Sequence, residues 1–494
     1  MPDVSTRATS TVGDPKGRAS WLGTKVVATI GPGSSKPEVL EPLLLSGVHV
    51  VRINFSHGSL DDHKEVVDRV REIADRHQLT VAIMGDLCGP KIRLGPVKDN
   101  GVAIETGSTL RIVTEELVGD ATRVCTNQPD VLKDIKVGHR VLVDDGMIRF
   151  VVTESNEDGL VCKCEIGGII RSRKGVNLPD SDLRIDALTE KDRTDLKWAI
   201  TNDLDYLAIS FVRTAADVKL LRRLIEAECV EVHIVSKIET PQAVRDIDNI
   251  IEASDAILVA RGDLGVEMDI VHVPRVQKEI CARCRRYGTP VIIATQMLQT
   301  MVTEAIPTRA EVSDVANAIV DGADAVMMSA ETAVGKYPIA AVEIMNRIAA
   351  EADRYSDHLS RAVAANEFCR GVTAAVGHSI QSVAENVDAV AVAIWTEKGV
   401  LARLLSRHRI DQPIVALTPS DAIRRRLALY YGVTSATVGK PDDTRKCLQK
   451  ADEVLAQQGW AKEGDPIVMG FGPASMEWGD TGSITIHRLG ARRR

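Results

Sequence analysis

The chain has 494 residues and a formal net charge of −8 at pH 7. This length exceeds what one hydrophobic core organises, so a single small module is excluded and two or three domains are expected. The acidic balance, without a long basic run, argues against a nucleic-acid or anionic-membrane surface.

The composition predicts a cytoplasmic protein with a disordered tail at residues 1–20. That stretch is rich in Ser, Thr, Gly and Pro and lacks the apolar core of a signal sequence. No apolar run approaches the roughly 18 residues of a membrane span, so no membrane partner is expected. Nine scattered cysteines are typical of reduced thiols. Cys281 and Cys284 form a C-x-x-C pair, but no second pair completes a zinc site.

Eight short apolar runs, most followed by a segment with helical periodicity, predict an α/β fold with a (β/α)8 TIM barrel formed by residues 21–90 and 180–353. The expected strands are residues 26–29, 48–54, 81–86, 206–210, 232–237, 256–260, 291–295 and 325–328. The clearest expected helices are residues 61–75, 215–226, 273–286, 310–321 and 340–350.

Two further segments depart from the barrel pattern. Residues 91–179 lack helical periodicity and alternate as β-strands do, which predicts a small β-barrel domain inserted as a lid on the active-site face. Residues 354–494 are expected to form a separate C-terminal α/β regulatory domain, a normal size for one domain. Its expected strands are residues 389–394, 413–417, 433–438, 466–469 and 483–487.

Charged side chains follow the expected barrel strands. Lys237 and Glu239 have the same parity at one strand end, and Asp263 follows the next strand. The carboxyl ends of barrel strands open on the active-site face. Two carboxylates suit a hard divalent cation, and an ammonium beside them suits an anionic group, so a metal-assisted phosphate site is predicted.

Other strand ends add charge and hydroxyl groups to the same face. Arginine matches phosphate oxygens with its fork of donors, and lysine adds a point charge. These residues are Arg52, Asn54, Ser56, Asp86, Lys91, Arg93, Thr295, Ser329 and Glu331.

Four motifs, in this order, resemble the pyruvate kinase family, and the resemblance extends over about residues 21–489. They are residues 234–239 (IVSKIE), 260–265 (ARGDLG), 294–298 (ATQML) and 307–311 (PTRAE). The resemblance implies transfer of the phosphoryl group of phosphoenolpyruvate to ADP, giving pyruvate and ATP. It also implies a homotetramer and a Mg²⁺ cofactor, with Mn²⁺ as a possible substitute.

The resemblance assigns roles to individual residues. Glu239 and Asp263 would hold Mg²⁺, and Lys237 and Arg52 would neutralise the phosphoryl group in transfer. The backbone around Gly262 and Asp263 would bind the substrate carboxylate. Thr295 and Ser329 would lie near the proton delivered to the enolate carbon, through a water relay. The nucleotide phosphates would be reached by Arg93 and Lys174.

The monovalent-cation region departs from the commonest family pattern. Many members bind K⁺ near the residues equivalent to Asn54, Ser56 and Asp86, and carry threonine, lysine and glutamate where this chain has Leu87, Cys88 and Lys91. We therefore expect the Lys91 ammonium to replace K⁺, so that K⁺ is not required.

The effector site also departs from the family. Residues 396–399 (TEKG) resemble a loop that holds an effector phosphate in many members, but Val400 and Leu401 replace a basic residue and a hydroxyl. A phosphorylated-metabolite effector at the C-terminal domain is therefore a hypothesis.

Two other functions fit parts of the pattern. A barrel lyase or aldolase could use Mg²⁺ on Glu239 and Asp263 without phosphoryl transfer, although the lid and the cationic strand ends favour a kinase. A catalytically dead metabolite sensor is the second rival, and the complete set of charged strand ends argues against it.

Overall fold

The computed structural model describes residues 23–356, 372–439, 444–471 and 482–490. It divides into two compact units, one formed by Thr24–Ser356 and the other by the described residues from 372 onward together with Gly23. The tail predicted at residues 1–20 lies outside the described residues. The predicted domain limits stay predictions, although the division near residue 356 lies close to the expected limit at 353.

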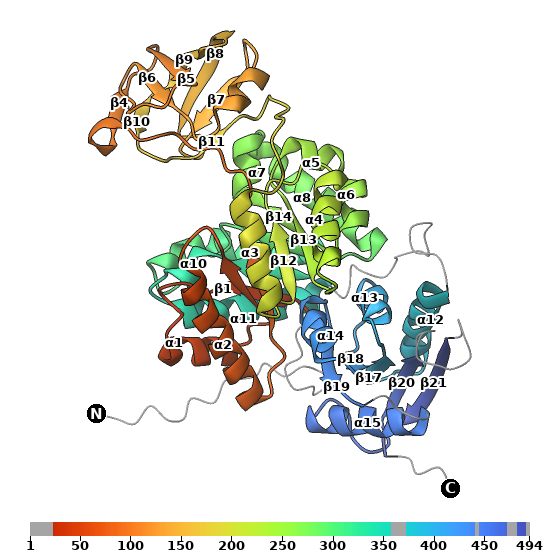
Figure 1. Cartoon of the computed structure of the whole chain (residues 1–494). Coiled ribbons are helices and arrows are strands. Elements are labelled where there is room, and N and C mark those ends of the chain that lie inside the picture. Colours follow the sequence, from red (N-terminus) through yellow and green to blue (C-terminus); the bar gives the residue numbers. More distant parts are fainter. Residues whose placement is uncertain (1–22, 357–371, 440–443, 472–481, 491–494) are drawn as a thin grey trace, which may run out of the picture. The chain divides into compact units, whose positions relative to one another are not determined.

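Eight parallel strands close into the predicted barrel, which confirms the fold class (Figure 1). Around the barrel the order is β1-β16-β15-β14-β13-β12-β3-β2. Most strand residues are buried apolar side chains, as expected of parallel strands covered on both faces. The strands are β1 (Lys25–Thr29), β2 (Val50–Asn54), β3 (Ala82–Asp86), β12 (Tyr206–Ile209), β13 (His233–Ile238), β14 (Ala256–Ala260), β15 (Val291–Ala294) and β16 (Ala325–Met328).

Helices connect the barrel strands, and several begin with strong local signals. Capping boxes at Ser59, Thr189 and Thr308 satisfy free backbone N–H groups at the starts of α2, α3 and α9. The helices of this unit are α1 (Pro37–Leu45), α2 (Leu60–His77), α3 (Glu190–Thr201), α4 (Ala215–Ala227), α5 (Pro241–Arg245), α6 (Ile247–Ala253), α7 (Arg261–Glu267), α8 (Val273–Tyr287), α9 (Arg309–Val320), α10 (Ala330–Ala333) and α11 (Pro338–Ser356), with 3-10 turns η3 (Ile270–His272) and η4 (Gln299–Val302).

The insertion between β3 and β12 is a β domain with its own core. A six-stranded sheet has the order β11-β7-β8-β9-β5-β6, and β10 pairs with β4 in a second sheet. Buried Leu110, Phe150 and Leu160 belong to a cluster separate from the barrel core. The elements are η1 (Lys98–Asn100), β4 (Val102–Ile104), β5 (Thr109–Val113), β6 (Arg123–Cys125), η2 (Pro129–Asp134), β7 (Arg140–Val143), β8 (Ile148–Asn156), β9 (Gly159–Ile166), β10 (Gly168–Ile170) and β11 (Val176–Asn177). We call this insertion the lid.

The C-terminal unit is the predicted α/β domain. Its sheet has the order β19-β18-β17-β20-β21, in which β21 pairs antiparallel with β20 and the other described pairs are parallel. Trp395 and Phe471 lie buried in its core. The elements are α12 (Val372–Asn386), β17 (Ala391–Trp395), α13 (Val400–Ser406), β18 (Ile414–Thr418), α14 (Asp421–Arg426), η5 (Leu427–Leu429), β19 (Val433–Thr437), α15 (Thr444–Gln457), β20 (Pro466–Phe471) and β21 (Ser483–Arg488).

Candidate active site

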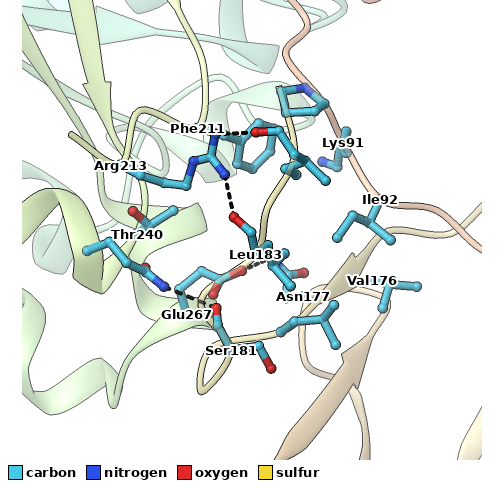
Figure 2. A pocket seen from close by; sticks show the side chains of 14 residues that line it. Lys91, Ile92, Val176, Asn177, Ser181, Leu183, Phe211, Arg213, Thr240 and Glu267 are labelled. Atoms are coloured by element: carbon cyan, nitrogen blue, oxygen red, sulfur yellow. Dashed lines mark hydrogen bonds between the residues drawn. The ribbon is translucent and has the colours of Figure 1, made fainter. Parts of the chain in front are cut away.

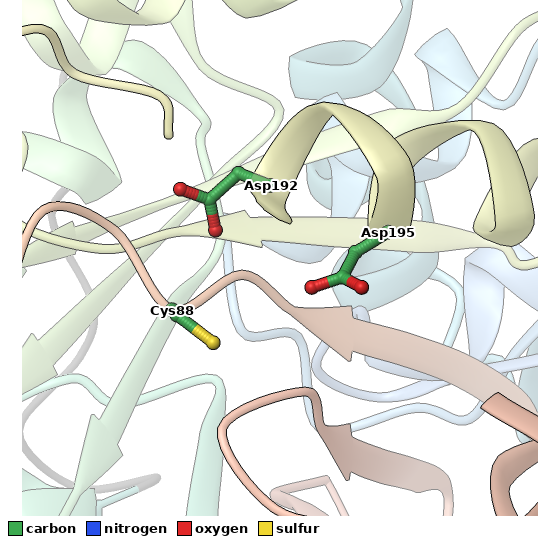
Figure 3. Close-up of side chains that lie close together, drawn as sticks. All are labelled: Cys88, Asp192 and Asp195. Carbon is green, nitrogen blue, oxygen red and sulfur yellow. The ribbon is translucent and has the colours of Figure 1, made fainter. Parts of the chain in front are cut away.

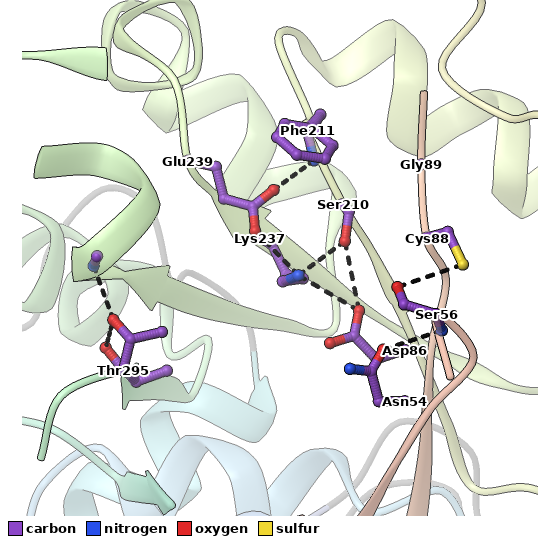
Figure 4. A network of polar contacts seen from close by, with 12 residues as sticks. Asn54, Ser56, Asp86, Cys88, Gly89, Ser210, Phe211, Lys237, Glu239 and Thr295 are labelled. Carbon is purple, nitrogen blue, oxygen red and sulfur yellow. Dashed lines mark hydrogen bonds and ion pairs between the residues drawn. The ribbon is translucent and has the colours of Figure 1, made fainter. Parts of the chain in front are cut away.

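Lys237 lies at the centre of a polar network at the carboxyl ends of β3, β12 and β13 (Figure 4). Its ammonium lies 2.9 Å from Glu239 Oε1 and 3.4 Å from Asp86 Oδ1, and it donates a hydrogen bond of 2.7 Å to Ser210 Oγ. Burial alone would lower the pKa of the Lys237 ammonium, but the charges of Asp86 and Glu239 outweigh burial and raise it. Lys237 is therefore a fixed positive charge.

Arg52 supplies a second positive charge beside the first. Its Nε and Nη2 lie 2.7 and 2.6 Å from Asp86 Oδ2, and Nη1 donates to Thr29 Oγ1 at 3.0 Å. Burial alone would raise the pKa of the Asp86 carboxyl group. The charges of Lys237 and Arg52 outweigh burial and hold this pKa below its ordinary value. Asp86 thus stays ionised and orients both cations toward one site.

Glu239 is almost completely buried, and its two oxygens have separate partners. Oε1 meets Lys237, and Oε2 accepts a hydrogen bond of 2.6 Å from the backbone N–H of Phe211. Burial is the main cause that raises the pKa of Glu239, and repulsion from Asp263 adds to it. Two carboxylates that repel each other in a buried site suit a divalent cation, which would relieve that repulsion. The donor set therefore fits Mg²⁺.

Helix α7 starts directly after β14 and brings Gly262 and Asp263 to the same face. The Gly262 N–H donates to Thr295 Oγ1 at 2.7 Å, and a side chain at Gly262 would approach that oxygen to 3.3 Å. Thr295 has φ 70°, an unfavourable backbone conformation for a β-branched residue, and such strain is concentrated at functional sites. The structure therefore joins two predicted site residues from different strand ends.

Ser329 comes from the end of β16, and its backbone is fixed by a carboxylate. Glu331 Oε2 accepts from the Ser329 N–H at 2.8 Å, while Oε1 accepts from the Leu298 N–H at 3.1 Å. Among the described residues, no hydrogen bond joins the hydroxyls of Ser329 and Thr295.

The two predicted nucleotide residues lie together at the base of the lid. Arg93 forms an isolated β-bridge with Gly175, directly after Lys174. Arg93 Nη1 donates to the Arg173 carbonyl at 3.2 Å, and Lys174 Nζ lies 2.7 Å from Asp144 Oδ1.

The predicted monovalent-cation region is only partly assembled. The Ser56 N–H donates to Asn54 Oδ1 at 3.1 Å, and Leu87 is buried next to Asp86. Within the described part of the chain, no hydrogen bond or ion pair joins the Lys91 ammonium to Asn54, Ser56 or Asp86. Its side chain lines a pocket at the lid instead.

Sequence reasoning missed Ser210, Phe211 and Glu267. Ser210 bonds Lys237 and lies 3.4 Å from Asp86, and only its place at a strand end signals this role. Phe211 acts through its backbone, which no side-chain pattern reveals. Burial raises the pKa of Glu267 to about 7, despite a hydrogen bond from Asn177 that opposes the shift.

Cys88, Asp192 and Asp195 form a second cluster, with one ligand atom of each within 4.8 Å of the others (Figure 3). Asp192 already accepts from Gly89 N–H and caps α3, and Asp195 pairs with Lys191 at 2.7 Å. Both carboxylates have structural partners, and no sequence motif or family resemblance points to a metal at this cluster, so we assign none here. Cys281 and Cys284 are buried residues of α8.

A closed barrel with paired carboxylates and fixed cations at its strand ends defines an α/β-barrel enzyme with a site for an anionic substrate. The family model for the pyruvate kinase barrel domain matches residues 22–342, and that for the pyruvate kinase alpha/beta domain matches residues 374–487. The chain belongs to the pyruvate kinase family.

Individual relatives agree with the family models over nearly the whole chain. A pyruvate kinase of Geobacillus stearothermophilus is 38% identical over 94% of this chain and 80% of its own length. A pyruvate kinase of Corynebacterium glutamicum is also 38% identical, over 94% of this chain and 98% of its own length. A crystal structure of a pyruvate kinase from Cryptosporidium parvum superposes with a TM-score of 0.88 at 33% identity, covering 95% of this chain and 96% of that one.

No helix in the described ranges combines the length and apolarity that crossing a bilayer requires.

Proposed function

We propose that this enzyme transfers the phosphoryl group of phosphoenolpyruvate to ADP, giving pyruvate and ATP, the last step of glycolysis. The observation that carries the proposal is the Lys237 ammonium held between Asp86 and Glu239, with Arg52 on the far side of Asp86. Phosphoryl transfer depends mainly on positioning and on neutralising oxygen charge, and two fixed cations supply this.

The chain's residues divide the chemistry between them. A β-phosphate oxygen of ADP forms the new P–O bond while the bond to the enol oxygen breaks, and Lys237 and Arg52 stabilise the phosphoryl oxygens during transfer. The N–H groups of Gly262 and Asp263 bind the substrate carboxylate, which would replace the present bond from Gly262 to Thr295. The enolate left behind then gains a proton at its terminal carbon through water ordered by Thr295, with Ser329 nearby.

The metal and the nucleotide would be held by separate groups. Glu239 and Asp263 would bind Mg²⁺, or Mn²⁺ in its place, and the bound ion would supply Lewis-acid neutralisation of phosphate charge. Arg93 and Lys174 would bind the nucleotide phosphates, supported by their shared place at the base of the lid.

A coupled assay for pyruvate, with phosphoenolpyruvate and Mg²⁺ in the presence and absence of ADP, tests the reaction. We expect pyruvate and ATP to form in equal amounts only when ADP is present. Pyruvate formed together with inorganic phosphate in the absence of ADP would show transfer to water and contradict the kinase reaction, whereas absence of any turnover of phosphoenolpyruvate would favour a lyase with another substrate or a metabolite sensor.

We further propose that the enzyme needs no K⁺, because Lys91 supplies the monovalent charge when the lid closes. In a buffer free of K⁺ and Na⁺, the wild-type enzyme should keep most of its turnover. Lys91→Glu should lower that turnover roughly a hundredfold, the usual size of a lost electrostatic group, and added K⁺ should restore it. The matched control is Lys98→Glu, a charge reversal at an exposed lid residue. Wild-type activity that appears only with K⁺ contradicts the proposal.

The remaining proposals concern assembly and regulation. The family resemblance supports a homotetramer in the cytoplasm.

A phosphorylated metabolite is proposed to bind near Thr396 and Gly399, where the Gly399 N–H donates to Thr396 Oγ1 at 2.9 Å in a tight turn. Isothermal titration with sugar phosphates and nucleotides tests it, and no heat of binding would remove it.

A further inference from the structure

A pocket at the junction of lid and barrel is lined by Lys91 and also by Glu267 and Asn177, which have no role in the reaction proposed above (Figure 2). Glu267 and Asn177 both line it and are in direct contact, since Asn177 Nδ2 donates to Glu267 Oε1 at 2.6 Å. The two residues are 90 positions apart in the chain, and this is a direct hydrogen bond between side chains of the lid and the barrel.

Each partner belongs to an element that carries a site residue. Glu267 is the last residue of α7, and the same short helix presents Gly262 and Asp263. Asn177 ends β11, which pairs with β7 in the lid sheet and directly follows the segment that carries Lys174. The hydrogen bond therefore links α7, which carries the proposed metal ligand Asp263, to the proposed phosphate-binding segment of the lid.

Further contacts restrain the lid segment and the helix that this hydrogen bond joins. Lys174 is tied to Asp144, at the end of the β7 strand. A side chain added at Gly146, in the following turn, would lie 3.7 Å from Val266 of α7, so this turn also lies close to the helix. A shift of Asn177 would therefore move Lys174 relative to Asp263.

The surroundings of the Glu267 carboxyl group favour its protonated form, or a form that accepts a hydrogen bond, over a charged form exposed to water. Burial raises its pKa, the hydrogen bond from Asn177 and the charge of Arg140 lower it, and the charges of Asp263 and Glu239 raise it. A half-buried carboxyl group in that setting costs stability unless a partner compensates it, and the hydrogen bond from Asn177 supplies that compensation.

We propose that Glu267 is a positioning residue, which through Asn177 sets the place of Lys174 over the metal-bearing helix and so aligns ADP with the phosphoryl group. The inference rests on the proposed kinase reaction and deepens it. Neither Glu267 nor Asn177 needs to touch a substrate.

Steady-state kinetics of Glu267→Ala, Glu267→Gln and Asn177→Ala test the inference. Both alanine variants should raise KM for ADP and lower kcat, each about tenfold, because a misplaced phosphate ligand weakens both nucleotide binding and alignment. Glu267→Gln replaces the carboxylate oxygen by an amide oxygen that can still accept from Asn177, so its KM for ADP and its kcat should stay within about threefold of wild type. The double variant should be no worse than either single variant, because both remove one link.

Binding of Mn²⁺ and phosphoenolpyruvate without ADP separates positioning from damage to the metal site. This affinity should stay within about twofold of wild type in the alanine variants, since Asp263 and Glu239 are retained. Gln242→Ala is the matched control, because Gln242 lines the same pocket and donates to the Ser181 carbonyl, just beyond the lid, at 3.2 Å, while no hydrogen bond within the described part of the chain joins its side chain to α7 or β11.

Each outcome decides the inference. Unchanged ADP kinetics in both alanine variants overturn it, as does an equal effect in Gln242→Ala. Loss of Mn²⁺ and phosphoenolpyruvate binding in Glu267→Ala also overturns it, because Glu267 would then act on the metal site itself. Absence of wild-type turnover would overturn the kinase proposal first, and the inference with it, whereas wild-type turnover with normal variants overturns the inference alone.

Discussion

Replacing Lys237 by methionine is expected to lower kcat about a thousandfold, with a smaller change in KM for phosphoenolpyruvate. Methionine keeps most of the side-chain length but removes the charge that faces Asp86 and Glu239. The lost interaction is strongest while the phosphoryl group is in transfer, and removing one such preorganised donor typically costs roughly a hundredfold to a thousandfold. Steady-state kinetics with saturating Mg²⁺ and ADP measure the effect.

The same substitution also removes a positive charge from beside two buried carboxylates, those of Asp86 and Glu239. Breaking a buried ion pair costs about 3–5 kcal/mol, so the variant should unfold more easily in the absence of metal. Asp86 keeps Arg52, and Glu239 keeps the Phe211 N–H, which limits the loss. Thermal unfolding with Mg²⁺ present therefore distinguishes lost chemistry from lost folding.

Lys197→Met is the matched control for this variant. Lys197 is an exposed residue of α3, so the same chemical change should leave kcat within about twofold, as surface substitutions usually do. Wild-type kcat in Lys237→Met, or an equal loss in Lys197→Met, would contradict the role assigned to Lys237.

The barrel was predictable because its strands are continuous apolar runs, whose burial leaves a strong local pattern. The strand ends at Lys237 and Asp86 were predictable for the same reason, since topology sends the carboxyl ends of parallel strands to one face. The alternation of side chains along a strand does not show which partner each side chain contacts. The Lys237 contact with Ser210 depends on the relative register of β12 and β13, which is a tertiary property.

Helix α7 shows a second limit of sequence reasoning. Its glycines at positions 262 and 265 favour a turn on local propensity, yet the segment is helical directly after β14. Gly262 also leaves room for Thr295, whose hydroxyl oxygen a side chain at position 262 would approach to 3.3 Å. Because α7 is helical, Glu267 reaches the lid, and no local pattern could foresee its contact with Asn177.

Replacing Asp263 by asparagine is expected to weaken Mn²⁺ binding roughly ten- to a hundredfold and to lower kcat/KM at least as much. Asparagine has nearly the shape of aspartate but lacks the charge that a hard divalent cation requires. Losses of this size are typical when a group that supports a metal site is removed, and a direct ligand should matter no less. Electron paramagnetic resonance of free Mn²⁺ gives the affinity, and kinetics over a range of Mn²⁺ give the activity.

Excess Mn²⁺ should restore part of the activity of Asp263→Asn, because Glu239 and its partners Lys237 and Phe211 stay in place. Asp269→Asn is the matched control: Asp269 is exposed just beyond α7, and among the described residues its carboxylate accepts only from the nearby Val271 N–H, so this variant should bind Mn²⁺ as the wild type does. Unaltered Mn²⁺ affinity in Asp263→Asn would show that the metal is held elsewhere. Because Asp263 and Glu267 share α7, weakened metal binding in Asp263→Asn, together with normal metal binding but a raised KM for ADP in Glu267→Ala, would show that one helix holds the metal at its start and positions the lid at its end.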